Sequence, residues 1–214
     1  MRTAIYFAIA YVAIVGLLAF SLLSQVGFTN VYFPSQKAKV ITMDQALESG
    51  EKFLASLNNP DLAITEIEEF TNHFYIETFE KSTGIHAFEL LMDKYSGAIY
   101  PEPGPNMMWN TKYGSLMRRI GGMGWMGNMM VSFQGPPTAE MPVTAKQAVK
   151  YAQEFLRANI PGSVADEVAT FYGYYTLHVL KNGKIYGMLS VNGYSGQVWY
   201  HVWHGAFVDI KEIL

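Results

Sequence analysis

The chain describes nearly the same structural unit twice. Residues 41–46 read Ile-Thr-Met-Asp-Gln-Ala and residues 143–148 read Val-Thr-Ala-Lys-Gln-Ala. Phe53 and Phe155 follow these segments at the same offset. An internal repeat constrains the architecture more than any single motif does, because both copies must satisfy one fold.

The ends of the two copies match as well. Residues 95–100 read Tyr-Ser-Gly-Ala-Ile-Tyr, and residues 194–199 read Tyr-Ser-Gly-Gln-Val-Trp. We therefore predict two tandem domains, residues 37–100 and residues 143–214, of which the second carries a C-terminal extension.

Each copy should begin with a helix and continue as strands. Thr42 with Gln45, and Thr144 with Gln147, form the capping-box pattern at the start of an amphipathic segment. Segments rich in β-branched and aromatic residues follow, and Asn182-Gly183 is the dipeptide that a tight hairpin turn prefers. The pattern predicts an α+β fold of two units, each made of a helix and an antiparallel meander.

These features resemble the PepSY domain. The resemblance rests on the Thr-x-x-Gln-Ala helix start, the strands, and the closing Tyr-Ser-Gly-x-Ile/Val-Tyr/Trp segment, and two copies cover most of the chain. PepSY domains are non-catalytic modules outside the cytoplasmic membrane, and protease inhibition has been proposed for them. The resemblance implies such a role here and supplies no catalytic residue.

The N-terminal segment has the composition of a membrane anchor. Residues 3–36 contain no charged side chain, and residues 4–23 are almost entirely apolar. A helix of about 20 apolar residues spans the hydrocarbon core of a bilayer, whereas the apolar part of a signal peptide is usually shorter. A cleaved signal peptide is the alternative, but the length favours a retained anchor in residues 1–36. The predicted location is the cell membrane, single-pass, with the C-terminal domains on the outer face.

A proline-bounded connector, residues 101–142, separates the two copies. Seven of the chain's twelve methionines lie between positions 107 and 130, which makes this segment unlike the rest of the chain. Its glycines argue against a long regular helix. The predicted roles are docking to a membrane protein or to lipid, packing between the repeats, or binding of Cu(I) by thioethers.

The residues predicted to dock a partner or lipid are the methionines, tryptophans and arginines of this connector: Met107, Met108, Trp109, Met117, Arg118, Arg119, Met123, Trp125, Met126, Met129 and Met130. The candidate Cu(I) ligands are Met123, Met126, Met129 and Met130. Neither a cofactor nor any other metal site is predicted.

Charge is distributed unequally between the two copies. Residues 41–100 hold eleven acidic and three basic residues, a net charge of −8, whereas residues 143–200 have a net charge of +2. We interpret the first copy's glutamates as a solvated sheet face or rim, namely Glu66, Glu68, Glu69, Glu77 and Glu80. The asymmetry predicts that the two copies face different neighbours.

The histidines carry no metal-binding spacing. His201 and His204 are three residues apart, and two ligands are too few for a metal site, so we expect aromatic-belt residues at a domain end. His73, His86 and His178 are expected at the surface or rim.

The sequence predicts a non-enzymatic, membrane-anchored binding or accessory module outside the cytoplasm, such as a subunit of a membrane complex. It contains none of the G-x-S-x-G, H-E-x-x-H or phosphate-loop motifs, so catalytic residues are not predicted. Its net charge of −3 gives no sign of nucleic-acid binding. The expected partners are membrane lipid, through residues 4–23, and a membrane or extracytoplasmic protein. Inhibition of an extracytoplasmic protease and copper or silver handling are the alternative functions.

Overall fold

Each repeated unit begins with a helix that has a capping box at its N-terminus. The computed structural model describes residues 40–122 and 137–213, and all statements below concern these residues. Helix α2 spans Met43–Ser56 and helix α5 spans Ala145–Asn159. In both, the capping threonine accepts from the backbone N–H of the glutamine three residues on, whose side chain accepts from the threonine N–H. The predicted helix starts are confirmed.

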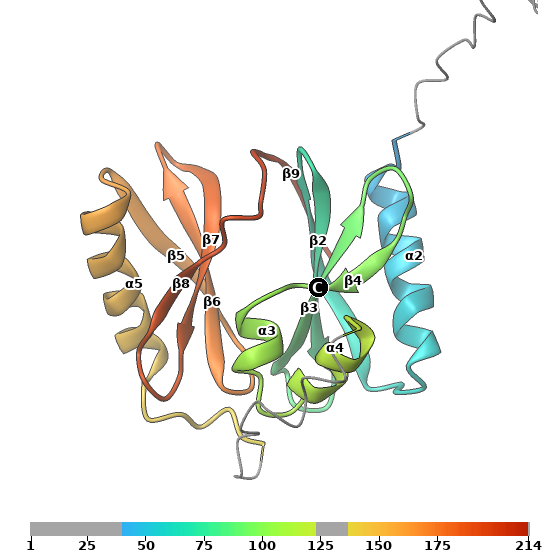
Figure 1. Cartoon of the computed structure of the whole chain (residues 1–214), viewed down its shortest axis with the longest axis horizontal. Helices are drawn as coiled ribbons and strands as arrows, with labels where there is room; N and C mark the ends of the chain where they lie inside the picture. The colour runs from blue at the N-terminus through green and yellow to red at the C-terminus, as the bar shows by residue number, and fades with distance from the viewer. Residues whose placement is uncertain (1–39, 123–136, 214) are drawn as a thin grey trace, which may run out of the picture. The chain divides into compact units, whose positions relative to one another are not determined.

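Two antiparallel sheets follow the helices (Figure 1). The first has the order β4-β3-β2-β1-β9 and the second has the order β5-β6-β7-β8. The strands of the first sheet are β1 (Leu62–Phe70), β2 (His73–Glu80), β3 (His86–Asp93), β4 (Ile99–Pro101) and β9 (Phe207–Glu212). Those of the second are β5 (Ser163–Thr170), β6 (Tyr174–Lys181), β7 (Lys184–Asn192) and β8 (Val198–Tyr200). The α+β class and the antiparallel meanders are confirmed.

The hairpin between β6 and β7 has the predicted turn. Lys181 pairs with Lys184, and both residues between them have positive φ angles, 54° at Asn182 and 72° at Gly183. Asparagine and glycine tolerate this left-handed conformation better than other residues, which explains why this dipeptide places the turn.

Each helix packs on the outer face of its own sheet and encloses an apolar core. The buried leucines that anchor the helices are Leu54 on α2 and Leu156 on α5. Phe53 and Phe155 occupy equivalent positions, but both are only partly buried at the edge of these cores. The repeat therefore places equivalent residues correctly, while the neighbouring leucine points more directly at the sheet.

A β-bulge changes which residues of β1 face the helix. Leu62 and Ile64 face α2, and the pairing register shifts between Ile64 and Glu66. After this shift Ile67 faces the helix, because one extra residue reverses the alternation of a strand. Strand β5 has a bulge between Asp166 and Val168, at the equivalent position of the second copy.

The end of the chain crosses from the second sheet to the first. Strand β9 pairs antiparallel with β1, with Glu68 opposite Ile210. Residues 207–212 thus complete the first sheet, although the repeat had grouped them with the second unit. We call the segment between β8 and β9 the crossover. Strand β9, which follows it, pairs with the edge of β1, which would otherwise expose unpaired backbone groups.

The described part of the connector packs on the first unit. It forms two short helices, α3 (Pro105–Met108) and α4 (Gly114–Ile120), and Met107, Tyr113 and Met117 join the apolar core beneath α2. Among residues 40–122 and 137–213, no helix is long and apolar enough to cross a membrane. The predicted anchor, residues 4–23, lies outside the described residues.

Candidate functional site: the polar interface between the two sheets

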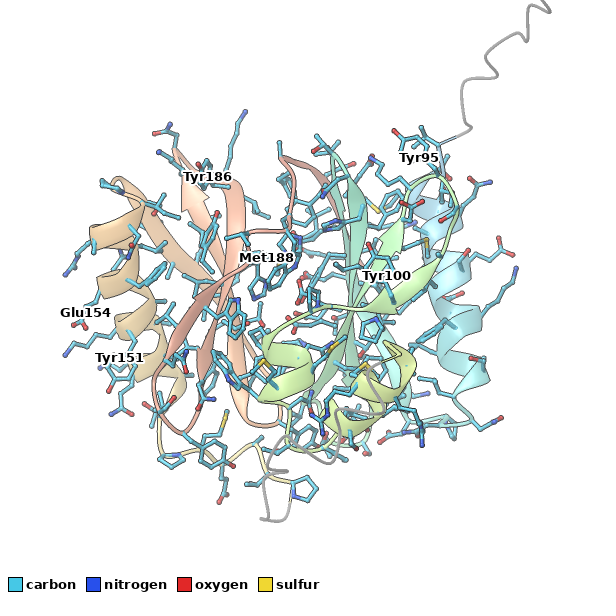
Figure 2. The ribbon with its side chains drawn as sticks, viewed as in Figure 1. Tyr95, Tyr100, Tyr151, Glu154, Tyr186 and Met188 are labelled. Carbon is cyan, nitrogen blue, oxygen red and sulfur yellow. The ribbon has the colours of Figure 1, made fainter. Side chains whose placement is uncertain are left out.

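The two sheets meet through the faces that point away from their helices. Side chains of β1 and β3 hydrogen-bond to side chains of β6 across this interface. Met188 of β7, labelled in Figure 2, packs here against Phe70, Tyr75 and Leu91 of the first sheet. Around this small apolar cluster the interface is polar, which is unusual for a buried surface.

The glutamates predicted to be solvated are largely inside this interface. Glu68, Glu77 and Glu80 expose 0%, 4% and 2% of their surface, and Glu66 and Glu69 are partly buried. The prediction of a solvated face was wrong because the second sheet covers the acidic face of the first. A buried carboxylate requires partners, and Glu68 and Glu80 have some of theirs in the second unit.

Glu89, on β3, is also fully buried in this interface. It accepts hydrogen bonds from Tyr75 (2.9 Å), Thr176 (2.7 Å) and Tyr174 (2.7 Å), the last two from the opposite sheet. Burial and the nearby charge of Glu102 raise the pKa of Glu89 well above its ordinary value. Hydroxyl donors suit either form of this carboxyl group, so the contact persists when Glu89 is neutral.

Glu80 is held by charged and hydroxyl donors instead. It accepts from Tyr172 of the second unit (2.6 Å) and contacts Tyr113 and Lys112 of the connector. Burial alone would raise the pKa of Glu80, but these hydrogen bonds outweigh it and bring the pKa to about 2. This carboxylate therefore joins the first sheet to the connector and to the loop between β5 and β6 of the second unit.

His178 of β6 bridges two carboxylates from different sheets. Its Nε2 lies 2.8 Å from Glu68 of β1, and its Nδ1 lies 2.7 Å from Glu167 of β5. Burial alone would lower the pKa of His178, but the bonds and charges of Glu68, Glu66 and Glu167 raise it to about 10. An imidazolium donates from both nitrogens, so no lone pair remains there for a metal ion. The expectation of a surface histidine was wrong at this position.

A pocket opens beside this ion pair. It has a volume of about 290 Å³, and Glu66, Glu77 and Glu167 line it together with His86 and His178. Both bulges border it, since Glu66 follows one and Glu167 forms the other with a φ of 44°. Bulges re-aim side chains, and strained residues concentrate at functional sites.

The pocket holds more carboxylates than its cations neutralise. Burial, then the charges of Glu77 and Glu68, raise the pKa of Glu66 to about 8. His86 Nδ1 lies 2.7 Å from a Glu77 oxygen, but the angles do not meet hydrogen-bond geometry. One oxygen of Glu68 is also buried without a hydrogen-bond partner. The surplus negative charge would favour a positively charged ligand.

A second histidine–carboxylate group lies where the chain leaves the second sheet. His201 Nδ1 and His204 Nε2 lie 3.4 Å and 3.0 Å from the same oxygen of Glu102, and all three side chains are at least 99% buried. Burial alone would raise the pKa of Glu102, but His201 and His204 hold it well below its ordinary value. The prediction of aromatic-belt residues at a domain end was wrong, because the crossover to β9 turns both histidines inward.

His73 adds a third imidazole ring, and a fourth titratable side chain, to this group. Its Nε2 lies 2.7 Å from His204 Nδ1, and only 4% of the residue is exposed. Burial and then His204 lower the pKa of His73 to about 4, so His73 is neutral near pH 7. This residue was also expected at the surface, and the crossover covers it.

Some of the predicted docking residues lie in the protein interior, some lie at its surface, and the others lie outside the described residues. Met107, Met117 and Arg118 are buried, and Arg118 donates to the carbonyl of Met107. Met108 and Arg119 are exposed, and Trp109 is half-buried with its ring against Trp199. The remaining residues lie outside the described ranges: Met123, Trp125, Met126, Met129 and Met130. Docking stays a prediction, as does Cu(I) binding.

Comparisons with known proteins add little. No family model and no curated protein matches the chain. Among solved structures it is similar to the Bacillus megaterium YpeB C-terminal domain, with 10% sequence identity and a TM-score of 0.27. The match covers 78% of this chain and 64% of that chain, so this chain spans somewhat less than two thirds of its neighbour. A likeness at this level does not establish a shared fold, and the PepSY resemblance stays a prediction.

Sequence reasoning missed Glu89, Glu102, Tyr174 and Thr176 entirely. One signal was present in strands β2 and β6, where side chains alternate between the face toward the helix and the face away from it. The face away from the helix carries Tyr75, Tyr174 and His178, which are polar residues of types that are often buried in part. Opposite net charges on the two copies were the other signal, because complementary charges favour contact between the copies.

Proposed function

We propose that this chain is a non-enzymatic, membrane-anchored binding module outside the cytoplasm, which captures a basic side chain of a partner protein in the acidic pocket between its sheets. The observation that carries the proposal is the pocket lined by Glu66, Glu77 and Glu167, with surplus negative charge. Membrane attachment rests on the apolar composition of residues 4–23.

The size of the pocket favours a side chain over a cofactor. Pockets for small-molecule ligands usually measure about 300–1,000 Å³, and this one, at about 290 Å³, lies just below that range. An arginine side chain is long and slender, and its planar guanidinium can donate to two carboxylates at once. Glu66 and Glu77 supply acceptors on neighbouring strands, since these residues pair directly in the register of β1 and β2.

The protonation state of Glu66 makes binding measurable. With a pKa of about 8, Glu66 is mostly protonated at neutral pH. A guanidinium placed beside it favours the carboxylate, so binding should release a proton and strengthen as the pH rises from 6 to 9.

A pair of small probes tests this proposal directly. Nα-acetyl-L-arginine amide carries one guanidinium, whereas Nα-acetyl-L-citrulline amide has nearly the same shape without charge. We expect the full-length chain in detergent to bind the arginine probe, with chemical-shift changes at residues around the pocket, and to ignore the citrulline probe. Glu66→Gln should weaken binding by roughly tenfold, which corresponds to the loss of one partly buried charge pair.

The matched control is Glu51→Gln, which makes the same change on the exposed face of α2. It should leave the affinity unchanged. Equal binding of both probes, or an affinity that Glu66→Gln does not reduce, would exclude the pocket as a site for basic side chains. Capture from native membranes by the wild-type chain and by Glu66→Gln then identifies the partner as the protein lost in the variant.

A further inference from the structure

The histidine–carboxylate group beneath the crossover has unsatisfied atoms that converge on one point. Glu102, His201 and His204 each offer one ligand atom, and these atoms lie within 4.8 Å of one another. His201 Nδ1, His204 Nε2 and the second oxygen of Glu102 are buried without a hydrogen-bond partner. Buried polar atoms are rarely left unpaired, so three of them at one place call for an explanation.

The surrounding hydrogen bonds direct the lone pairs of both histidines toward Glu102. His201 Nε2 lies 2.9 Å from Ser190 Oγ, which in turn lies 3.0 Å from Thr176 Oγ1. The Thr176 hydroxyl donates to Glu89. With Ser190 donating to Thr176, His201 donates from Nε2 to Ser190, and its neutral form presents the Nδ1 lone pair to Glu102. That lone pair and the carboxylate repel each other unless a proton or a metal ion lies between them.

His204 is oriented in the same way. Its Nδ1 lies 2.7 Å from His73 Nε2, and with His204 as the donor of this hydrogen bond its Nε2 lone pair faces Glu102. Trp203 donates its indole N–H to Glu102 at 2.9 Å. Metal-bound histidines almost always donate their other nitrogen to a second partner, and bound carboxylates are hydrogen-bonded in turn. All three residues show this arrangement.

We propose that Glu102, His201 and His204 bind a divalent transition-metal ion, for which Zn²⁺ is the best match. Imidazole nitrogen and carboxylate oxygen are both zinc ligands, and tetrahedral ligands at bond lengths near 2.05 Å lie ~3.3 Å apart. The two measured separations from Glu102 to the histidines, 3.4 Å and 3.0 Å, are close to this value. These three ligands leave the fourth position of the tetrahedron open to water.

This ion would hold the crossing of the chain in place. Glu102 follows β4 of the first sheet, His201 follows β8 of the second, and His204 lies in the segment that leads to β9. The site thus joins the end of the second unit to the first. It is separate from the acidic pocket, where His178 has both nitrogens engaged, so the two proposals can fail independently.

Zinc binding by the full-length chain tests the proposal. The protein is purified through a tag without histidine, stripped of metal under denaturing conditions and refolded, and then titrated with Zn²⁺ against a chromophoric chelator. We expect one equivalent of Zn²⁺ to bind and to raise the Tm. Co²⁺ at the same site should show the visible d–d absorption of a tetrahedral centre.

Three variants locate the site. Glu102→Gln and His204→Gln should each weaken zinc binding by at least 100-fold and abolish the rise in Tm, while His86→Gln, a histidine beside the acidic pocket, should bind as the wild type does. Circular dichroism confirms that each variant is folded. Failure of the folded wild-type chain to bind Zn²⁺ overturns the proposal, and so does zinc binding that survives Glu102→Gln but is lost in Glu68→Gln.

Discussion

The two repeated units share one plan but present opposite chemistry to each other. Both place an amphipathic, capped helix on the outer face of a meander, and both carry a bulge at the equivalent point of the first strand. On the inner faces, the first sheet contributes carboxyl groups such as Glu68 and Glu89, whereas the second contributes donors such as His178 and Tyr174. The outer faces thus preserve the common fold, and the inner faces make the pair specific.

This difference explains the charge asymmetry. A net charge of −8 on residues 41–100 against +2 on residues 143–200 is not a difference between two solvated surfaces. It reflects a buried interface in which one copy accepts hydrogen bonds and the other donates them. Removing a donor should therefore be more damaging than removing an exposed charge of either copy.

The largest effect is expected from breaking the buried pair of His178 and Glu68. His178→Ala leaves the fully buried Glu68 without its partner, and we expect a loss of about 3–5 kcal/mol in the free energy of unfolding. Chemical denaturation of the full-length chain in detergent, followed by tryptophan fluorescence, measures it. The matched control is Glu167→Gln, the other contact of His178, whose side chain is 67% exposed and should cost less than about 1 kcal/mol. A loss for His178→Ala as small as that of the control would refute a buried polar interface.

The next effect tests the equivalence of the outer faces. Leu54→Ala and Leu156→Ala each remove a buried side chain from the contact between a helix and its sheet, so each should cost about 2–5 kcal/mol. Phe53→Ala and Phe155→Ala, at the partly buried neighbouring positions, should cost less than their leucines. Denaturation midpoints of the four variants provide the comparison. A large cost in one unit and none in the other would contradict a shared core plan.

The smallest expected effect, counted per pH unit, is the dependence of the free energy of unfolding on pH. The folded state raises the pKa of Glu66 from 4.5 to about 8, and that of His178 from 6.5 to about 10. The stabilisation from each group is complete below its ordinary pKa and is lost as the pH rises through the raised value. The free energy of unfolding should therefore fall between pH 4.5 and pH 10, by at most about 1.4 kcal/mol per pH unit for each group.

Glu66→Gln sharpens this prediction. With Glu66 removed, the decline between pH 4.5 and pH 6.5 should become shallower, because only the contribution of Glu89 remains in this range. The decline above pH 6.5 that belongs to His178 should persist. Glu80 does not interfere, because its pKa of about 2 places its titration below this window. The exposed variant Glu51→Gln should keep the wild-type profile. A profile that Glu66→Gln leaves unaltered would show that the pocket is not the source of the pH dependence.

Several features followed from local sequence alone. The capping boxes at Thr42 and Thr144, the turn at Asn182 and Gly183, and the apolar faces of both helices were predictable, because each depends on residues that are close in the chain. The repeat itself identified two copies of one unit. Burial of the glutamates was not predictable from the same information, since a strand with one polar face looks the same whether water or a second sheet covers it.

The sequence by itself determined the local units: where helices start, where the chain turns, and which face of each strand is apolar. Only the tertiary structure decided what the polar faces meet. It brings Glu68 to His178 across 110 positions of the chain, and it brings Glu102 to Trp203 across 101. It also assigns β9 to the first sheet, although these residues follow the second repeat. The physical reason is that local preferences act within a few residues, whereas a buried charge is stabilised by whichever partner the folded chain places beside it.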